Sequence, residues 1–167
     1  MWTLKELLSH TAGNGRLDWI GLRPERRAPM LEPETARMLT QRGLEGDRAS
    51  AKTGRTRQVT LVQAEHLTTI AALIRQDKIA PQQLRRNLLI SGINVLCLRR
   101  ARFRIGQAIL EGTGHAHPCS RLEETLGHGG YNAARGLGGI TARVLDGAIV
   151  RIGDDVELLE AAPEDGA

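Results

Sequence analysis

The sequence predicts an α+β protein that is predominantly β, with a curled or barrel-like mixed sheet and a few short helices. Three observations support this prediction: short β-branched or alternating segments recur along the chain, glycines and prolines separate them, and only one stretch has a clear helical period. The chain has 167 residues, of which 41% are hydrophobic, and this is enough for one core. We therefore expect a single domain over residues 1–167, with a short flexible tail at residues 163–167.

The N-terminal part is expected to contain one short helix followed by a strand. Residues 3–9 can form one or two helical turns, and Gly13-Asn14-Gly15 is a strong turn signal before a strand at residues 16–21. A regular helix is excluded from the next stretch, because proline lacks an N–H group and restricts the residue before it. The prolines of this stretch are Pro24, Pro29 and Pro33.

The middle of the chain combines a loop, two strands and the clearest helix. Residues 43–52 are rich in Gly, Asp, Arg and Ser, which is typical of a loop, and the β-branched residues of 57–62 indicate a strand. Over residues 63–76, apolar side chains recur at spacings of three and four, which predicts a helix with one buried face. A proline in the first turn suits a second short helix at residues 81–87, before a strand at residues 88–92.

The second half of the chain is dominated by strand patterns. Arginines alternate with apolar residues over 100–105, so a strand here would place three guanidinium groups on one face. Residues 104–110 and 151–158 both resemble a strand, a glycine turn and a strand, and residues 140–145 are β-like. The chain thus predicts six to nine short strands.

The composition narrows the classes of partner. A formal net charge of +4 suits an anionic partner, with phosphate as plausible as nucleic acid. Aromatic content is only 2% and no nucleic-acid-binding motif is present, so nucleic-acid binding is a minor alternative. The chain lacks a run of about 18 apolar residues, and its first residues carry charges where a signal peptide would be apolar. We expect a soluble, cytoplasmic protein with no membrane partner.

The segment around Cys119 is the most informative for chemistry. Ser120 and Glu123 match a capping-box pattern, so Ser120 is predicted to be the N-cap of a helix, with Cys119 just before it. The positive end of the helix dipole, together with Arg121, favours a thiolate, which is a nucleophile and a soft-metal ligand. The alternative is that Cys119 is a small packing residue ahead of the helix.

Other cysteine and histidine residues offer a contrast. Cys97 lies among aliphatic neighbours that hide a thiol and raise its pKa, so we interpret it as part of the core. His115 and His117 alternate with Cys119, but this spacing is unlike that of known zinc sites. The histidines could line a pocket beside Cys119 or be solvated loop residues.

The arginines fall into two groups, and other motifs are missing. Each group could be a solvated face or could bind phosphate or pyrophosphate through bidentate guanidinium contacts. The groups are Arg85 and Arg86, and then Arg99, Arg100, Arg102 and Arg104. The sequence contains no Walker loop, no Rossmann glycine motif after a strand and no nucleophile elbow, so it offers no support for nucleotide binding or serine hydrolysis.

Taken in order, several segments resemble the MOSC family, the domain named after the C-terminus of molybdenum cofactor sulfurase. The resemblance covers roughly residues 16–159, and the ordered set is more specific than any one motif. The matching segments are residues 21–24 and 29–30, 43–48, 57–61, 85–92, 103–106, 110–111, 118–123, 138–145 and 152–154. The resemblance implies a β-rich, barrel-like fold whose core spans about residues 16–159.

The resemblance also implies a site. The family's single functional cysteine corresponds to Cys119, which is expected to be the catalytic residue and the molybdenum ligand, with molybdenum cofactor as the bound group. Candidate cofactor contacts by position are Arg48, Arg57, Arg86, Asn87, Ser91 and His117. Pyridoxal phosphate and zinc have no support, and the chain has no room for a pyridoxal-phosphate or iron–sulfur domain. A separate electron donor or cysteine desulfurase is therefore expected as a partner.

Enzyme and carrier remain alternatives at this point. Relatives similar to the amidoxime-reducing components are molybdenum-dependent oxidoreductases that reduce N-hydroxylated compounds, with the cysteine on the metal. The second possibility is a sulfurtransferase or a non-enzymatic carrier, in which Cys119 bears a persulfide for the assembly of metal–sulfur cofactors. The sequence contains no signature that selects a substrate.

Overall fold

The computed structural model describes residues 1–166, in which seven strands close into a barrel. Neighbouring strands of the barrel are antiparallel except for β4 and β5. In order around the barrel, the strands are β1 (Gly15–Ile20), β10 (Asp155–Glu160), β6 (Arg102–Ile105), β7 (Ala108–His115), β8 (Ile140–Asp146), β4 (Val59–Gln63) and β5 (Leu88–Ser91). The predicted α+β class and barrel-like sheet are confirmed.

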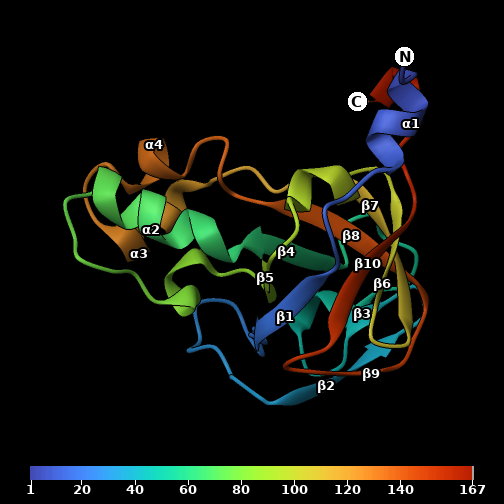
Figure 1. Ribbon diagram of the computed structural model, residues 1–167. Helices are drawn as coiled ribbons and strands as arrows, with labels where there is room; N and C mark the ends of the chain where they lie inside the picture. Colours follow the sequence, from blue (N-terminus) through green and yellow to red (C-terminus); the bar gives the residue numbers. More distant parts are fainter. Residues whose placement is uncertain (167) are drawn as a thin grey trace.

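The parallel pair β4 and β5 requires a crossover connection, because adjacent parallel strands cannot be joined by a tight turn. The crossover contains α2 (Ala64–Leu73) and the 3-10 helix η2 (Pro81–Leu84), and it leads to one side of the barrel. Two further short helices, α3 (Ser120–Leu126) and α4 (Gly130–Ala134), gather with α2 there (Figure 1). This helical layer presents Cys119 at the start of α3.

The remaining elements lie outside the barrel. A three-stranded sheet has the order β3, β2, β9, and the helix α1 lies beside the C-terminal segment, away from the helical layer (Figure 1). The strands are β2 (Thr35–Leu39), β3 (Gly43–Leu44) and β9 (Ile149–Arg151), and α1 covers Leu4–Ser9. The other 3-10 helices are η1 (Arg48–Ala51), η3 (Val95–Leu98) and η4 (Glu164–Gly166). None of the helices within residues 1–166 has the length and hydropathy needed to cross a membrane.

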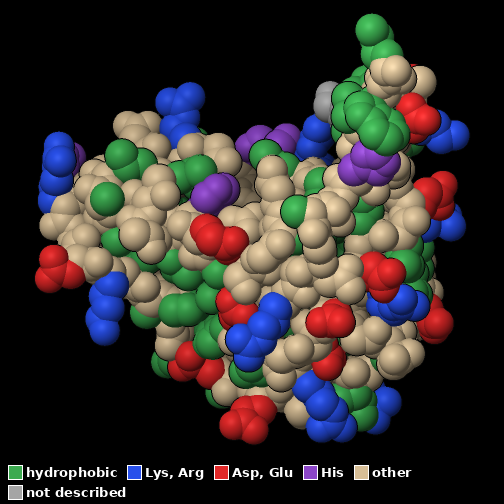
Figure 2. Space-filling view, viewed as in Figure 1, with side chains coloured by type: hydrophobic (Ala, Val, Ile, Leu, Met, Phe, Trp, Pro, Cys, Tyr) green, Lys and Arg blue, Asp and Glu red, His purple; other side chains and the backbone are tan. Residues whose placement is uncertain are grey.

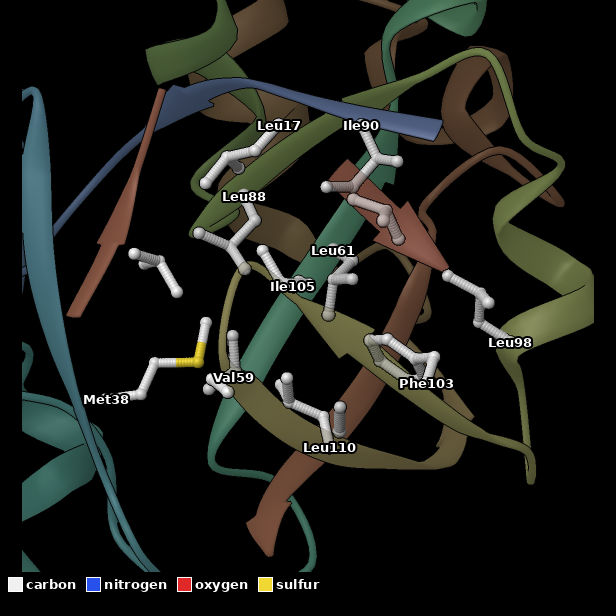
Figure 3. Packing of buried hydrophobic residues seen from close by; sticks show 14 of the residues in the cluster. Leu17, Met38, Val59, Leu61, Leu88, Ile90, Leu98, Phe103, Ile105 and Leu110 are labelled. Carbon is white, nitrogen blue, oxygen red and sulfur yellow. The ribbon is translucent and has the colours of Figure 1, made fainter. Parts of the chain in front are cut away.

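Two apolar clusters hold these layers together. Inside the barrel, aliphatic side chains from strands all round the wall point toward one another, with Phe103 as the largest member (Figure 3). The second cluster joins Val62 and Leu89 on the outer face of the barrel to Ile70 of α2 and Leu122 of α3. Because Leu122 is fully buried only three residues after Cys119, this second cluster anchors the segment that carries the cysteine.

Several elements differ from the sequence-based prediction. The expected loop at residues 43–52 contains β3 and η1, and the expected helix at residues 81–87 is only the 3-10 turn η2. Arg85 adopts the left-handed conformation, with φ 56°, and so ends η2 before Asn87. The described residues contain ten strands, one more than the upper limit of the six to nine predicted. β3 has only two residues, which are too few to show a strand pattern in the sequence. Within the expected flexible tail at residues 163–167, which stays a prediction, Glu164–Gly166 form η4, and Ala167 lies outside the described residues.

The arginine-rich strand predicted at residues 100–105 is β6, and its basic face contacts carboxylates. Arg102 lies 3.6 Å from Glu111 and 3.9 Å from Glu160, and Arg104 forms an ion pair with Glu157. Acidic and basic side chains are likewise interspersed on the barrel half of the face shown in Figure 2. Arg102 and Arg104 therefore belong to cross-strand ion pairs on the surface, whereas Arg100 lies before β6, in a turn with φ 62°, and does not share their strand face.

Candidate functional site

A pocket of about 270 Å³ opens beside Cys119, and arginines form most of its wall. Four parts of the chain supply it: the loop after β1, the start of η1, the turn before β5, and the start of α3. Its lining residues are Arg23, Arg26, Arg27, Arg48, Arg85, Arg86, Cys119, Ser120, Arg121, Leu122 and Glu124. We call this the arginine pocket. With Leu122 as the one aliphatic residue in this lining, the pocket is suited to a strongly anionic ligand.

Cys119 occupies the N-cap position of α3, with extended backbone (φ −135°, ψ 173°). Its side chain makes no capping hydrogen bond and is exposed, so the thiol is accessible from the pocket. The prediction that Ser120 is the N-cap was wrong. The carboxylate of Glu123, which the capping box needs, instead accepts hydrogen bonds from the backbone N–H groups of Gly129 and Tyr131, each at 2.8 Å.

Arg86 is buried beside this segment, with 8% of its surface exposed. Its guanidinium donates to the backbone carbonyls of Gly138 at 2.8 Å, Ala116 at 3.0 Å and His117 at 3.2 Å. Burial lowers the pKa of Arg86 to about 10, repulsion from Arg23 and Arg57 acts in the same direction, and Cys119 opposes them. The cation is thus held next to the segment that leads to the cysteine.

A polar network centred on buried Asp47 and Asn87 connects Arg23 of the arginine pocket to β4 of the barrel. The Asp47 carboxylate accepts hydrogen bonds from the Arg23 guanidinium at 2.9 and 3.1 Å and from the Asn87 amide at 3.0 Å. Asn87 also donates to the carbonyl of Gly21 and accepts from the N–H of Thr60, both at 3.0 Å. The side chain of Asn87 is consequently occupied by protein partners.

The positive charge of the arginine pocket is only partly compensated. Arg23 pairs with Asp47, and Arg27 and Arg121 share Glu124 at 3.3 and 2.6 Å. Within residues 1–166, no carboxylate lies within ion-pair distance of the other four pocket arginines, which are Arg26, Arg48, Arg85 and Arg86. Burial lowers the pKa of Arg85, and repulsion from Arg121, Arg23 and Arg48 adds to this. An anion in the pocket would relieve that repulsion.

The backbone of the arginine pocket contains two strained positions. Arg27 has φ 65° and Arg85 has φ 56°, values in the left-handed region that side-chain-bearing residues rarely adopt. The Arg85 guanidinium donates to the carbonyl of Ala28 at 2.8 Å, which ties these two turns together. Such strain persists only where surrounding contacts over-determine it, and it is frequent at functional sites.

The structure brings together some of the site residues predicted from sequence and separates others. Cys119, Arg48 and Arg86 line the arginine pocket. Arg57 is exposed and outside the lining, although its charge acts on Arg86. Ser91 ends β5, at the opposite end of the strand from Asn87. The ring of His117 is exposed, with its centroid 5.5 Å from that of His115, and only its carbonyl meets a pocket arginine.

Sequence reasoning missed three arginines that precede η1. Arg23, Arg26 and Arg27 follow β1 in the proline-punctuated stretch, far from Cys119 in the sequence. Their only sequence signal was an unusual density of arginine between prolines.

Cys97, in contrast, packs partly buried against the barrel core, and burial raises the pKa of its thiol, as predicted.

The arrangement allows soft-metal or sulfur chemistry at Cys119 beside an anion-binding wall. No group of three or more His, Cys, Asp or Glu residues within the described chain is placed to hold a metal ion by itself. A metal at Cys119 would therefore need ligands from a bound group. A group that carries both soft ligands and a phosphate fits the residues present, since the thiol and the arginines line one pocket.

The comparisons with known proteins agree with this fold. A family model described as the MOSC domain matches residues 48–157. The YuaD protein from Bacillus subtilis is similar in structure, with a TM-score of 0.74 and 18% identity, over 91% of this chain and 98% of that chain.

Two structures of YiiM are similar as well. YiiM from Escherichia coli has a TM-score of 0.65 and 21% identity, covering 86% of this chain and 69% of that chain. YiiM from Geobacillus stearothermophilus has a TM-score of 0.70 and 14% identity, covering 87% and 75% respectively. Identities this low show the fold alone. No curated protein matches the sequence.

Proposed function

Because the chain belongs to the MOSC domain family, which is associated with molybdenum cofactor, we propose that it binds this cofactor in the arginine pocket, with Cys119 as a ligand to the metal. The observation that carries the proposal is the position of Cys119: an exposed thiol on a wall otherwise made mostly of arginines. A thiolate is a soft ligand, and guanidinium groups bind phosphate through paired hydrogen bonds.

The pocket arginines divide by how free their guanidinium groups are. Arg26 and Arg48 are exposed and have no carboxylate partner among residues 1–166, and the Arg85 guanidinium donates one hydrogen bond, to the carbonyl of Ala28. These three arginines are our candidates for holding the phosphate of the cofactor. The other predicted contacts, Arg57, Asn87, Ser91 and His117, would act from outside the pocket lining.

The proposed activity is the reduction of N-hydroxylated compounds, in which two electrons and two protons convert an N–OH group to N–H and release water. The bound cofactor would supply the redox-active metal. We expect a separate donor protein to supply the electrons. The arginine pocket would exclude cations and orient the anionic end of the bound group.

The test is metal and pterin analysis of protein purified from a host that makes molybdenum cofactor. We expect about one molybdenum per chain in the wild-type protein and in the Cys97→Ser control, and loss of the metal in Cys119→Ser. Full metal loading of Cys119→Ser would refute the ligand role. Wild-type protein without molybdenum or pterin would refute cofactor binding.

A persulfide carrier is the second candidate, and the exposure of Cys119 favours it. An accessible thiol without a side-chain hydrogen bond can receive sulfur from a cysteine desulfurase and pass it to another protein. Incubation with a desulfurase and cysteine should then add one sulfur atom to Cys119, measured by mass spectrometry of the intact and digested chain. An unchanged mass of Cys119 peptides would eliminate this candidate.

A further inference from the structure

We propose that Arg86 is a positioning residue, which holds the segment before Cys119 in place, and that it is not a contact for the bound anion. The hydrogen bonds of Arg86 show that it fixes the segment before Cys119. The inference rests on the proposed function only in one respect, namely that the residue positioned in this way is a metal ligand. It revises the sequence-based prediction that Arg86 contacts the cofactor.

The donors of Arg86 are almost fully used by the protein. Nε donates to the carbonyl of Gly138 at 2.8 Å, and Nη1 donates to the carbonyl of Leu84 at 3.4 Å. Nη2 donates to two carbonyls, those of Ala116 at 3.0 Å and His117 at 3.2 Å. A guanidinium has five N–H groups, so only one, on Nη1, is left. Arg86 therefore cannot offer the two parallel N–H groups that bind a phosphate in bidentate fashion.

The carbonyls that Arg86 contacts come from three separate parts of the chain. Residues 116–117 lead through Pro118 to Cys119, Gly138 precedes β8, and Leu84 ends η2. The N–H of Ala116 donates to the carbonyl of Gly139 at 2.9 Å. A Cβ atom at Gly138 would collide with the carbonyl of Ala116, so the two segments pack in direct backbone contact. Arg86 lies at their junction and fastens the Cys119 segment to the barrel.

Arg85, the neighbouring arginine, differs from Arg86 in that most of its guanidinium N–H groups have no protein partner. It lines the same pocket, the one hydrogen bond of its guanidinium goes to the carbonyl of Ala28, and it is more exposed than Arg86. Most of its N–H groups are free for a ligand. The two residues can therefore be compared directly. Substitution of Arg86 should loosen the backbone of the segment before Cys119, and substitution of Arg85 should weaken the binding of anions.

The first experiment uses the wild-type, metal-free protein and inorganic pyrophosphate as the probe. The side-chain Nε–H signals of the arginines are followed by NMR during a pyrophosphate titration. We expect the Arg85 signal to shift, and the Arg86 signal to stay nearly unshifted and to exchange slowly with water. A shift of Arg86 as large as that of Arg85 would overturn the proposal, whatever happens to any variant.

The second experiment compares Arg86→Gln with Arg85→Gln in the full chain. For Arg86→Gln we expect amide hydrogen exchange to be about tenfold faster in the segments whose carbonyls it contacts, chiefly residues 113–121, with the Kd for pyrophosphate within about twofold of wild type. For Arg85→Gln we expect unchanged exchange and a Kd about tenfold higher. The reverse pattern, or equal effects on Kd, would overturn the proposal.

The variant Arg86→Lys separates charge from geometry. Lysine keeps the charge but lacks the planar fork, so it should not restore slow exchange in residues 113–121. Full restoration by lysine would show that charge alone matters, which contradicts the positioning role. Molybdenum analysis of the wild-type protein tests the proposed function independently, so absence of the metal would leave these exchange and affinity results intact.

Discussion

At the scale of single residues, Asp47 shows how one buried carboxylate organises the loop of the arginine pocket. It is 3% exposed and accepts hydrogen bonds from the backbone N–H groups of Arg23 and Ala49, besides those from the side chains of Arg23 and Asn87. Burial raises the pKa of Asp47, but the hydrogen bonds and the charge of Arg23 outweigh burial and hold the pKa below its ordinary value of 3.8. The network thus depends on an ionised Asp47.

We predict that Asp47→Asn lowers the free energy of unfolding by about 3 kcal/mol at pH 7, because it leaves the partly buried Arg23 guanidinium without its counter-charge. A depressed pKa contributes stability above the ordinary value, and this contribution is lost as the pH falls through the folded-state value. The difference between wild type and variant should therefore shrink below about pH 4. Urea unfolding at pH 7 and pH 3 measures both effects. Glu45→Gln, which removes an exposed pair with Arg37, is the control and should cost about 0.5 kcal/mol or less.

The two cysteines should differ in reactivity. Burial raises the pKa of the Cys97 thiol, and Cys97 packs against the barrel core, whereas Cys119 is exposed. We predict that iodoacetamide at pH 7.5 modifies Cys119 at least about tenfold faster than Cys97, because the thiolate is the reacting form. Peptide mapping by mass spectrometry measures the two rates. Equal rates would contradict the burial of Cys97.

Sequence reasoning at this scale worked where neighbours in the sequence are neighbours in space. Cys119 and Cys97 could be told apart because adjacent residues create the setting of each thiol. The N-cap prediction failed because Glu123 finds stronger partners in the N–H groups of Gly129 and Tyr131. Those partners depend on how α4 folds back onto α3, which a local motif does not contain.

At the scale of elements, the pairing of β4 with β8 depends on Gly139. Gly139 has φ 86°, and a Cβ atom there would collide with the backbone carbonyl of Leu61 in β4. We predict that Gly139→Ala lowers the free energy of unfolding by about 3 kcal/mol, since it combines backbone strain with a steric clash. Gly136→Ala is the matched control, with φ 75° and open space around its Cβ position. It should cost only about 1 kcal/mol, from strain alone. Thermal or urea unfolding measures both changes.

The elements that could be predicted are those with a strong local period. Alternating or β-branched residues marked β1, β4, β6 and β8, and the three-and-four spacing marked α2. The short elements were missed because tertiary contacts stabilise them. The two residues of β3 pair only with β2, and η1 begins where the Asp47 carboxylate caps the N–H of Ala49. Neither element has a period long enough to be recognised.

At the scale of the whole molecule, barrel closure explains why the arginine pocket was only partly foreseen. The composition of the segments predicted a barrel-like sheet, but the strand order β1-β10-β6-β7-β8-β4-β5 cannot be inferred from local patterns. That order sets β1 beside β5, and so brings the loop after β1 next to Arg85 and Arg86. The loop after β1 contributes Arg23, Arg26 and Arg27, which no local motif connects with Cys119.

The distribution of charge over the molecule leads to a last prediction. The net charge is +4, but the arginines of β6 are paired with glutamates while those of the arginine pocket are mostly unpaired. We therefore predict that metal-free protein binds pyrophosphate in the pocket, with a Kd that rises about tenfold between 50 and 500 mM NaCl, because salt screens the attraction. Isothermal titration calorimetry measures the Kd at each concentration.

Two double variants with the same charge change locate the effect. Arg26→Gln with Arg48→Gln removes two unpaired cations of the pocket and should raise the Kd at least about tenfold. Arg102→Gln with Arg104→Gln removes two cations that are already paired on the barrel surface, so the Kd should stay within about twofold. Equal weakening by both would mean that the Kd depends on net charge alone.

A pocket of about 270 Å³ is too small for a nucleic-acid duplex. If the protein retained DNA at low salt and the pocket variants did not change this, the DNA would bind at a separate surface.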